Sequence, residues 1–335
     1  MKKFNMGIIG CGDFLRIETD RLKASKRIKV TSLFDTDNHR ARKHAAALGA
    51  TAVDSMDAIF GDPAIELVGI FVPPWVRKNV LISAVKAGKN IIATKPLGSS
   101  VADCRAMVRV VENSAVRCGI IYRRTGNAIM ETAKSLFDSG RIGKLALVRH
   151  DWIHHYPQWN NWALDPSKNG GPFTDAEIHN LNFTRYLMGR KATHCTYFSD
   201  NLTHPDLSCP DTECMKLDFE GNGTAHLFIT WAADLKVTSQ EGNFREHIDI
   251  TYLVTDQGWR VTFEADHVAA SKDGKIETFL AVPLTGTIFD RFAASILKGE
   301  PNPRDLPTAR EASEDIQIIR IGEDHCNHRT KLNLS

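Results

Sequence analysis

Short, continuous apolar runs alternate with longer helical segments through the first 122 residues. The runs are rich in Ile and Val, and they lie at 4–10, 28–34, 65–72, 90–94 and 117–122. Continuous apolar strands that alternate with helices are typical of a parallel sheet whose two faces are both covered. The pattern therefore predicts an α/β fold in which residues 1–122 form a doubly wound parallel sheet.

The pattern changes in residues 123–335, where strands with alternating apolar and polar positions dominate. In 215–220, for example, Met, Leu and Phe alternate with Lys, Asp and Glu. Helices are predicted at about 125–139, after Gly170-Gly171-Pro172, and in 286–299 and 307–328, with the first strand at about 144–154. These residues are predicted to form an α+β domain with an open, mainly antiparallel sheet.

Residues 248–264 predict a hairpin around Asp256-Gln257-Gly258. One face of the hairpin is expected to be apolar, with Ile248, Ile250, Tyr252, Val254, Trp259, Val261 and Phe263. The other face is mixed, with Asp249, Thr251, Leu253, Arg260 and Thr262. This pattern suits a sheet with helices on one side and water or a second subunit on the other.

Composition and charge exclude several classes of protein. The chain has 335 residues, of which 42% are hydrophobic and 24% charged, and a net charge of +2 that points to no nucleic-acid or membrane partner. No apolar run is long enough to span a bilayer, and no signal peptide is evident. The seven scattered cysteines lack a CxxC pair, so we interpret them as reduced thiols of a cytoplasmic protein.

A glycine turn follows the first strand and opens a helix. Gly10 and Gly12 match two positions of G-x-G-x-x-G, with Leu15 in place of the third. Gly10 permits the tight turn, and Gly12 lets the backbone approach a pyrophosphate. The helix begins at Asp13 and Phe14, and its N-terminus supplies oriented N–H groups for phosphates. A dinucleotide site of the Rossmann type is predicted, and a purely structural turn is the alternative.

Asp35 bears on the choice of cofactor. It ends the second strand, at the expected spacing of roughly 20 residues from the glycine turn. A carboxylate there accepts hydrogen bonds from both ribose hydroxyls and repels a 2′-phosphate, so NAD is predicted rather than NADP. His39 and Arg40 lie close enough in sequence to keep NADP open.

Two further positions carry chemistry. Lys95 follows the strand 90–94 at its carboxyl end, where open α/β sheets bind ligands, although solvated loop lysines are common. Asp175 and His179 lie four residues apart at the start of a helix, so they share one face. An imidazole suits removal of a hydroxyl proton. The alternative is an Asp that favours the helix dipole and a structural His.

Together these motifs resemble those of the Gfo/Idh/MocA oxidoreductases, the family of glucose–fructose oxidoreductase and inositol dehydrogenase. The resemblance covers almost the whole chain. It rests on Gly10-Cys11-Gly12 with Asp35, Val72-Pro73 in the family's T-P-N segment, Thr94-Lys95-Pro96 in its E-K-P segment, Gly170-Gly171 with Asp175-x-x-x-His179 in its G-G-G…D-x-x-x-H signature, and the segments 139–145 and 289–303. Departures are Thr94 for Glu, Pro74 and Arg77 for Asn and His, and Asn182 for Asp.

The resemblance implies a role for each matching residue. Lys95, His179 and Asp175 would be catalytic, with His179 as the acid–base and Lys95 near the nicotinamide ribose and the reacting oxygen. The second domain would bind substrate and form homodimers or homotetramers through its sheet. NAD would be bound by Gly10, Gly12, Asp13, Phe14, Asp35, Val72, Pro73 and Lys95.

The loop 151–166 is rich in aromatic, amide and imidazole side chains, which suit a sugar ring, although packing between domains is an alternative. The predicted substrate-binding residues are Lys95, Arg123, Trp152, His155, Trp162, Asp175 and His179. The histidine spacing matches no helical zinc motif, so no metal is predicted.

The sequence therefore predicts an NAD(H)-dependent oxidoreductase that acts on a secondary alcohol of a sugar, glycoside or cyclic polyol. A redox-neutral NAD-dependent glycosidase and a non-catalytic dinucleotide-binding protein remain alternatives.

Overall fold

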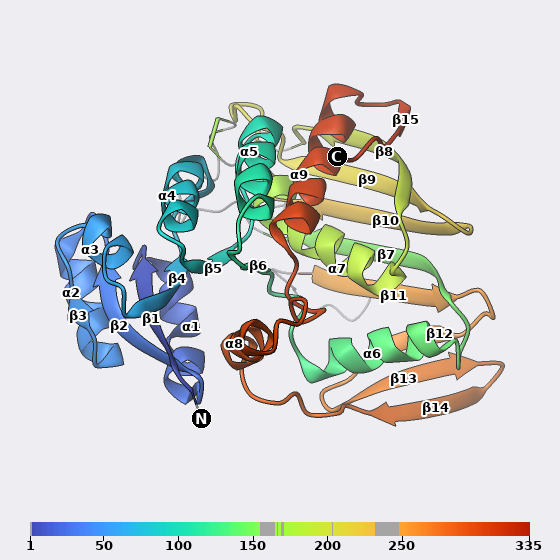
Figure 1. Ribbon diagram of the computed structural model, residues 1–335. Helices are drawn as coiled ribbons and strands as arrows, with labels where there is room; N and C mark the ends of the chain where they lie inside the picture. The colour runs from blue at the N-terminus through green and yellow to red at the C-terminus, as the bar shows by residue number, and fades with distance from the viewer. Residues whose placement is uncertain (1, 155–164, 166, 169–170, 203, 232–247) are drawn as a thin grey trace, which may run out of the picture. The chain divides into compact units, whose positions relative to one another are not determined.

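A computed structural model describes residues 2–154, 165, 167–168, 171–202, 204–231 and 248–335 (Figure 1). The chain forms two compact units. The N-terminal unit comprises residues 1–126 and 284–313, and the C-terminal unit comprises 127–283 and 314–335. In the parts of the chain that the structure describes, no helix has the length and apolar composition needed to cross a membrane.

The N-terminal unit is built on a six-stranded parallel sheet in the order β3-β2-β1-β4-β5-β6. The strands are β1 (Phe4–Ile9), β2 (Ile28–Phe34), β3 (Thr51–Ala52), β4 (Ile65–Ile70), β5 (Asn90–Thr94) and β6 (Cys118–Ile121). The helices are α1 (Asp13–Ala24), α2 (Asn38–Leu48), α3 (Met56–Phe60), α4 (Pro74–Lys86), α5 (Val101–Glu112) and α8 (Ile288–Lys298). Strand order reverses between β1 and β4, and ligands bind at the carboxyl ends beside such a reversal.

The predicted domain boundary lies between 122 and 123, whereas the compact units also group residues 284–313 with the N-terminal one. Helix α8 explains the difference, because Phe289, Phe292 and Ala293 belong to the same apolar core as β1, β2 and α1. Asp290 adds polar contacts, since its carboxylate accepts hydrogen bonds from the Ser25 hydroxyl and from backbone N–H groups of the following loop.

Among the described residues, the C-terminal unit is built on a nine-stranded sheet in the order β14-β13-β12-β11-β7-β10-β9-β8-β15, in which β7 and β10 run parallel to each other and the other neighbouring strands are antiparallel. The strands are β7 (Leu145–Ile153), β8 (Ala192–Asp200), β9 (Thr212–Phe219), β10 (Gly223–Thr230), β11 (Ile248–Thr255), β12 (Arg260–Phe263), β13 (His267–Lys272), β14 (Lys275–Leu280) and β15 (Arg329–Lys331). Helices α6 (Ala128–Ser139) and α7 (Ile178–Met188) pack on the sheet (Figure 1), and α9 (Ala309–Asp324) contains the boundary at 313. The predicted fold class is confirmed.

The predicted apolar face of the β11–β12 hairpin is wrong. Leu253 pairs with Val261 and both are buried, whereas Ile250 and Tyr252 are each 45% exposed. The turn explains the error, because it contains three residues, 256–258, closed by the hydrogen bond from the Thr255 N–H to the Trp259 carbonyl. A loop with an odd number of residues pairs even-numbered residues of one strand with even-numbered residues of the other, as Val254 pairs with Arg260. The two apolar sets therefore lie on opposite faces.

Candidate functional site

The glycine turn has the geometry of a phosphate-binding loop. Gly10 has a φ of +95°, and a Cβ there would lie 2.6 Å from the Phe71 carbonyl oxygen, so only glycine fits. Gly12 precedes α1, whose N-terminus no side chain caps. The first N–H groups of α1 and the helix dipole thus favour an anion here. Asp13 is exposed, and the Phe14 ring lies 4.9 Å from that of Phe71.

Asp35 is held rigidly beside this turn. Its carboxylate accepts hydrogen bonds from the N–H of Cys11 at 2.7 Å and from that of Asp37 at 2.8 Å, and its side chain is 9% exposed. Arg40 lies 4.0 Å from Asp35 but donates from Nε to Asp37 at 3.0 Å. The carboxylate is therefore held in place beside the glycine turn, and the guanidinium is already bonded to another acid.

The remaining predicted cofactor residues follow β4 and β5. Val72 and Pro73 lead from β4 into α4, and the partly exposed Lys95 follows β5, with its N–H donating to the Ile121 carbonyl at 3.2 Å. Because carboxyl ends of parallel strands meet at one edge of a sheet, these segments lie at the edge that carries the glycine turn. Arg123 is exposed beyond β6.

Asp175 and His179 lie in the C-terminal unit. The predicted helix begins instead with a π-helical turn, Phe173–Glu177, which α7 then continues. Asp175 is partly exposed on the π-helical turn, and His179 is buried in the first turn of α7. Such π segments are frequent at functional sites, because they leave backbone and side chains in positions that an α-helix does not offer.

A buried glutamate on β9 anchors this π-helical turn. The backbone N–H of Phe173 and the hydroxyl of Tyr197 both donate to the Glu213 carboxyl group. Burial raises the pKa of Glu213 to about 8, although the two donors oppose the shift. The sequence does carry a signal for this residue, because Glu213 is in phase with the buried positions Met215 and Leu217 of an alternating strand.

The Glu213→Gln variant is expected to lose the part of the pH dependence of folding stability that comes from the titration of Glu213. The folded state holds the Glu213 proton up to about pH 8, whereas an unperturbed carboxyl releases it near 4.5, so wild-type stability falls as the pH rises between these values. The slope is at most about 1.4 kcal/mol per pH unit. Urea unfolding across this range measures it, with the exposed Glu220→Gln as control. Parallel curves for wild type and Glu213→Gln would contradict the expectation.

A second hydrogen-bonded network supports the same helix start. The ring of His150 on β7 contacts Glu177 through Nδ1 at 3.1 Å and Asp249 on β11 through Nε2 at 2.9 Å. The second Glu177 oxygen accepts from the Asn180 amide at 2.9 Å. The network fixes Glu177, which lies midway between Asp175 and His179 in the sequence. Sequence reasoning missed His150, because a histidine within a strand gives no sign of its cross-strand partners.

The departure at Asn182 has a structural reason. Its amide donates to the buried carboxylate of Asp315 on α9 at 3.0 Å. An aspartate at 182 would place two carboxylates face to face without water, which is unfavourable. Asparagine therefore suits position 182, because its amide can donate a hydrogen bond to Asp315.

The predicted substrate loop is described only in part. Trp152 is at the end of β7, partly exposed, with its ring 5.3 Å from that of His154. His155, Trp162 and Gly170 lie outside the described residues. The seven cysteines form no disulfide. Burial raises the pKa of Cys11, in the glycine turn, to about 12, so this thiol stays protonated at neutral pH.

Two family models match the chain. One, described as an oxidoreductase family with an NAD-binding Rossmann fold, matches residues 4–122. The other, the GFO/IDH/MocA C-terminal domain, matches residues 130–251.

Curated relatives match with lower coverage. The scyllo-inositol 2-dehydrogenase (NAD(+)) of Bacillus subtilis is 28% identical over 182 residues, which are 53% of this chain and 51% of that protein. The 2,7-anhydro-N-acetylneuraminate hydratase of Mediterraneibacter gnavus is 25% identical over 223 residues, 64% of this chain and 57% of that protein. The chain spans about half the length of the curated relatives it matches.

Among solved structures, the aldose-aldose oxidoreductase from Caulobacter crescentus, complexed with glycerol, aligns with a TM-score of 0.84. The alignment covers 99% of this chain and 100% of that chain at 19% identity. At this identity the likeness concerns the fold.

Proposed function

The chain belongs to the Gfo/Idh/MocA oxidoreductase family, with an NAD-binding Rossmann domain at its N-terminus, and from this premise we propose that it transfers hydride between NAD and a secondary alcohol of a sugar, glycoside or cyclic polyol. The proposal rests on the edge of the N-terminal sheet that carries the glycine turn, which we call the cofactor edge. There Gly10 excludes any side chain, α1 begins without a cap, and Asp35 is fixed beside both.

These residues fit a dinucleotide. The turn at Gly10 and Gly12 would hold the pyrophosphate, and Asp35 would hold the adenosine ribose. Val72, Pro73 and Lys95 would contact the nicotinamide half. Bound NAD⁺ accepts hydride from a carbinol carbon.

The chemistry left to the side chains is proton transfer and charge stabilisation. In the proposed reaction His179 removes the hydroxyl proton as the carbinol C–H bond breaks, and the Lys95 ammonium stabilises the developing alkoxide. Asp175 orients the imidazole or contacts the same substrate. In the reverse direction His179 returns the proton to the alkoxide.

The substrate class rests on the relatives and on the loop 151–166. One relative is named as an inositol dehydrogenase, and the loop offers aromatic and hydrogen-bonding side chains. The relative that is named as a hydratase favours a second candidate, a redox-neutral NAD-dependent glycosidase. We also propose a homodimer or homotetramer formed through the open sheet, on which Ile250 and Tyr252 are exposed.

A substrate panel tests the proposal. Hexoses, inositols and aryl glycosides are incubated with the protein and NAD⁺ while NADH absorbance and glycoside cleavage are both followed. Net NADH from a free polyol supports the dehydrogenase, whereas cleavage without net NADH supports the glycosidase. NAD binding without turnover across the panel would leave a dinucleotide-binding protein.

Wild-type protein is expected to bind NAD(H) at least about tenfold more tightly than NADP(H), because Asp35 repels a 2′-phosphate. Asp35→Ala removes the ribose hydrogen bonds and is expected to weaken NAD(H) binding and narrow this difference. Titration of both cofactors by fluorescence measures the two affinities. Equal or tighter binding of NADP(H) by wild type would contradict the preference for NAD(H), and would make Arg40 the candidate ligand of the 2′-phosphate.

A further inference from the structure

Arg77 on α4 is a buried cation at the cofactor edge of the N-terminal unit. Its side chain is 1% exposed. One terminal nitrogen donates to the carbonyl of Pro96 and the other to the carbonyl of Val72. These carbonyls belong to the segments that follow β5 and β4, so the guanidinium joins the two loops that would hold the nicotinamide half.

In the part of the chain that the structure describes, no acid neutralises the charge of Arg77. Among the described residues no ion pair includes Arg77, and its Nε has no hydrogen-bond partner. Burial lowers its pKa to about 10, so the group remains protonated at neutral pH. The side chains that interact with it electrostatically are those of Cys104, Tyr122 and Cys118, and none of them is a carboxylate. A net positive charge is thus held in a medium that screens it poorly.

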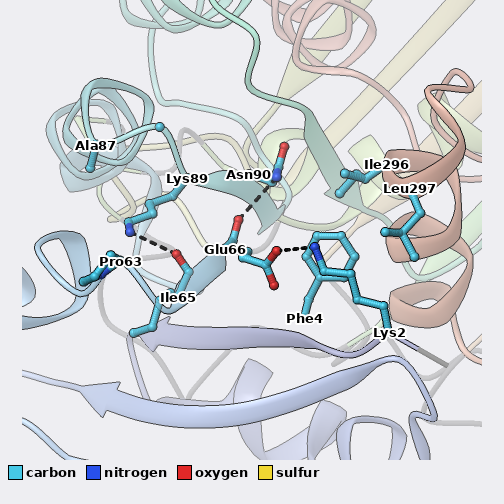
Figure 2. Close-up of a pocket in the computed structure, with 11 residues that line it drawn as sticks. Lys2, Phe4, Pro63, Ile65, Glu66, Ala87, Lys89, Asn90, Ile296 and Leu297 are labelled. Atoms are coloured by element: carbon cyan, nitrogen blue, oxygen red, sulfur yellow. Dashed lines mark hydrogen bonds and ion pairs between the residues drawn. The ribbon is translucent and has the colours of Figure 1, made fainter.

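The opposite edge of the same sheet offers an internal comparison. Lys89, which precedes β5, is also buried, and its Nζ donates to the carbonyls of Asp62 at 2.7 Å and Ile65 at 2.9 Å. Figure 2 shows this ammonium directed at the start of β4, beside the exposed pair Lys2–Glu66. At each edge a buried cation therefore binds two backbone carbonyls, and of these two cations Arg77 is the one at the cofactor edge.

We propose that Arg77 sets the redox preference of the cofactor site, so that the protein binds NADH more tightly than NAD⁺. This inference rests on the proposed function. In the proposed reaction the nicotinamide ring would gain a hydride from the carbinol carbon and lose its positive charge, while the hydroxyl proton would pass to His179. A fixed cation beneath the nicotinamide loops opposes the charged ring and not the neutral one. Arg77 thereby favours hydride removal from the alcohol.

The dissociation constants of NAD⁺ and NADH, measured separately by fluorescence titration, test the proposal. Arg77→Met keeps an unbranched apolar stem and removes the charge, so the ratio Kd(NAD⁺)/Kd(NADH) is expected to fall by roughly tenfold. Arg77→Lys keeps the charge, so the ratio should stay within about twofold of wild type. Lys89→Met loses the same kind of bonds at the other edge and should leave the ratio unchanged.

The outcomes separate this inference from the proposed function. An unchanged ratio in Arg77→Met, or an equal fall in Lys89→Met, would overturn the role of Arg77. Absence of binding of either nucleotide to wild type would overturn the proposed function instead. If Arg77→Met does not fold, Arg77→His, measured at pH 8 where a buried imidazole is neutral, gives the same comparison.

Discussion

His179→Asn is expected to lower the rate of hydride transfer by about 10²–10⁴-fold, the usual contribution of positioned acid–base catalysis. His179 is buried in the first turn of α7, in the C-terminal unit, whereas the predicted cofactor residues lie in the N-terminal unit. The variant should therefore keep its fold and its affinity for NAD. Asparagine preserves polarity at the site but does not accept the proton.

Single-turnover NADH formation at saturating NAD⁺ measures this step directly, without the contribution of product release. The control is His194→Asn, the same substitution on β8, where the ring contacts the Thr193 hydroxyl at 3.2 Å. The control is expected to react at the wild-type rate. A His179→Asn protein that transfers hydride at the original rate would remove His179 from the chemistry and leave Lys95 as the candidate base.

The fold of the N-terminal unit could be predicted because each signal for it lies within one short segment of the sequence. Each strand of a covered parallel sheet is a continuous apolar run, and the glycine turn follows such a run directly. Gly10 is required for a reason that a sequence motif already implies, since the backbone of Phe71 passes too close for a side chain. The role of α8 was not predictable, because the elements it packs against, β1, β2 and α1, lie far from it in the sequence.

The supporting contacts of the candidate site depend on the order of strands. His150 on β7 meets Asp249 because β11 pairs with β7, although about 100 residues separate the two in sequence. The π-helical turn likewise depends on Glu213, which reaches the Phe173 N–H from β9. Local periodicity carries no information on either pairing. It also gave the wrong apolar face for the β11–β12 hairpin, because adding or removing one residue in the turn moves the side chains of one strand to the other face of the sheet.

Lys95→Ala is expected to lower the rate of hydride transfer by about 10²–10³-fold, the scale found when one donor to a developing oxyanion is removed. Lys95 directly follows β5, and the next peptide carbonyl, that of Pro96, is bound by Arg77. This attachment holds the backbone at Lys95, so truncation of the side chain should leave the loop in place. The ammonium would then be the only group lost.

Lys95→Arg is expected to recover only part of the activity, because a planar guanidinium cannot occupy the position of a compact ammonium. Lys78→Ala is the matched control, since it removes a cation of the same unit that already pairs with Asp103 at 2.6 Å. Single-turnover NADH formation and NADH affinity are measured for all three variants. Loss of affinity without loss of rate would assign Lys95 to binding alone, whereas full activity in Lys95→Ala would exclude alkoxide stabilisation by this residue. Partial restoration of the Lys95→Ala rate by added ethylammonium, with none in Lys78→Ala, would identify the missing charge itself as the catalytic element.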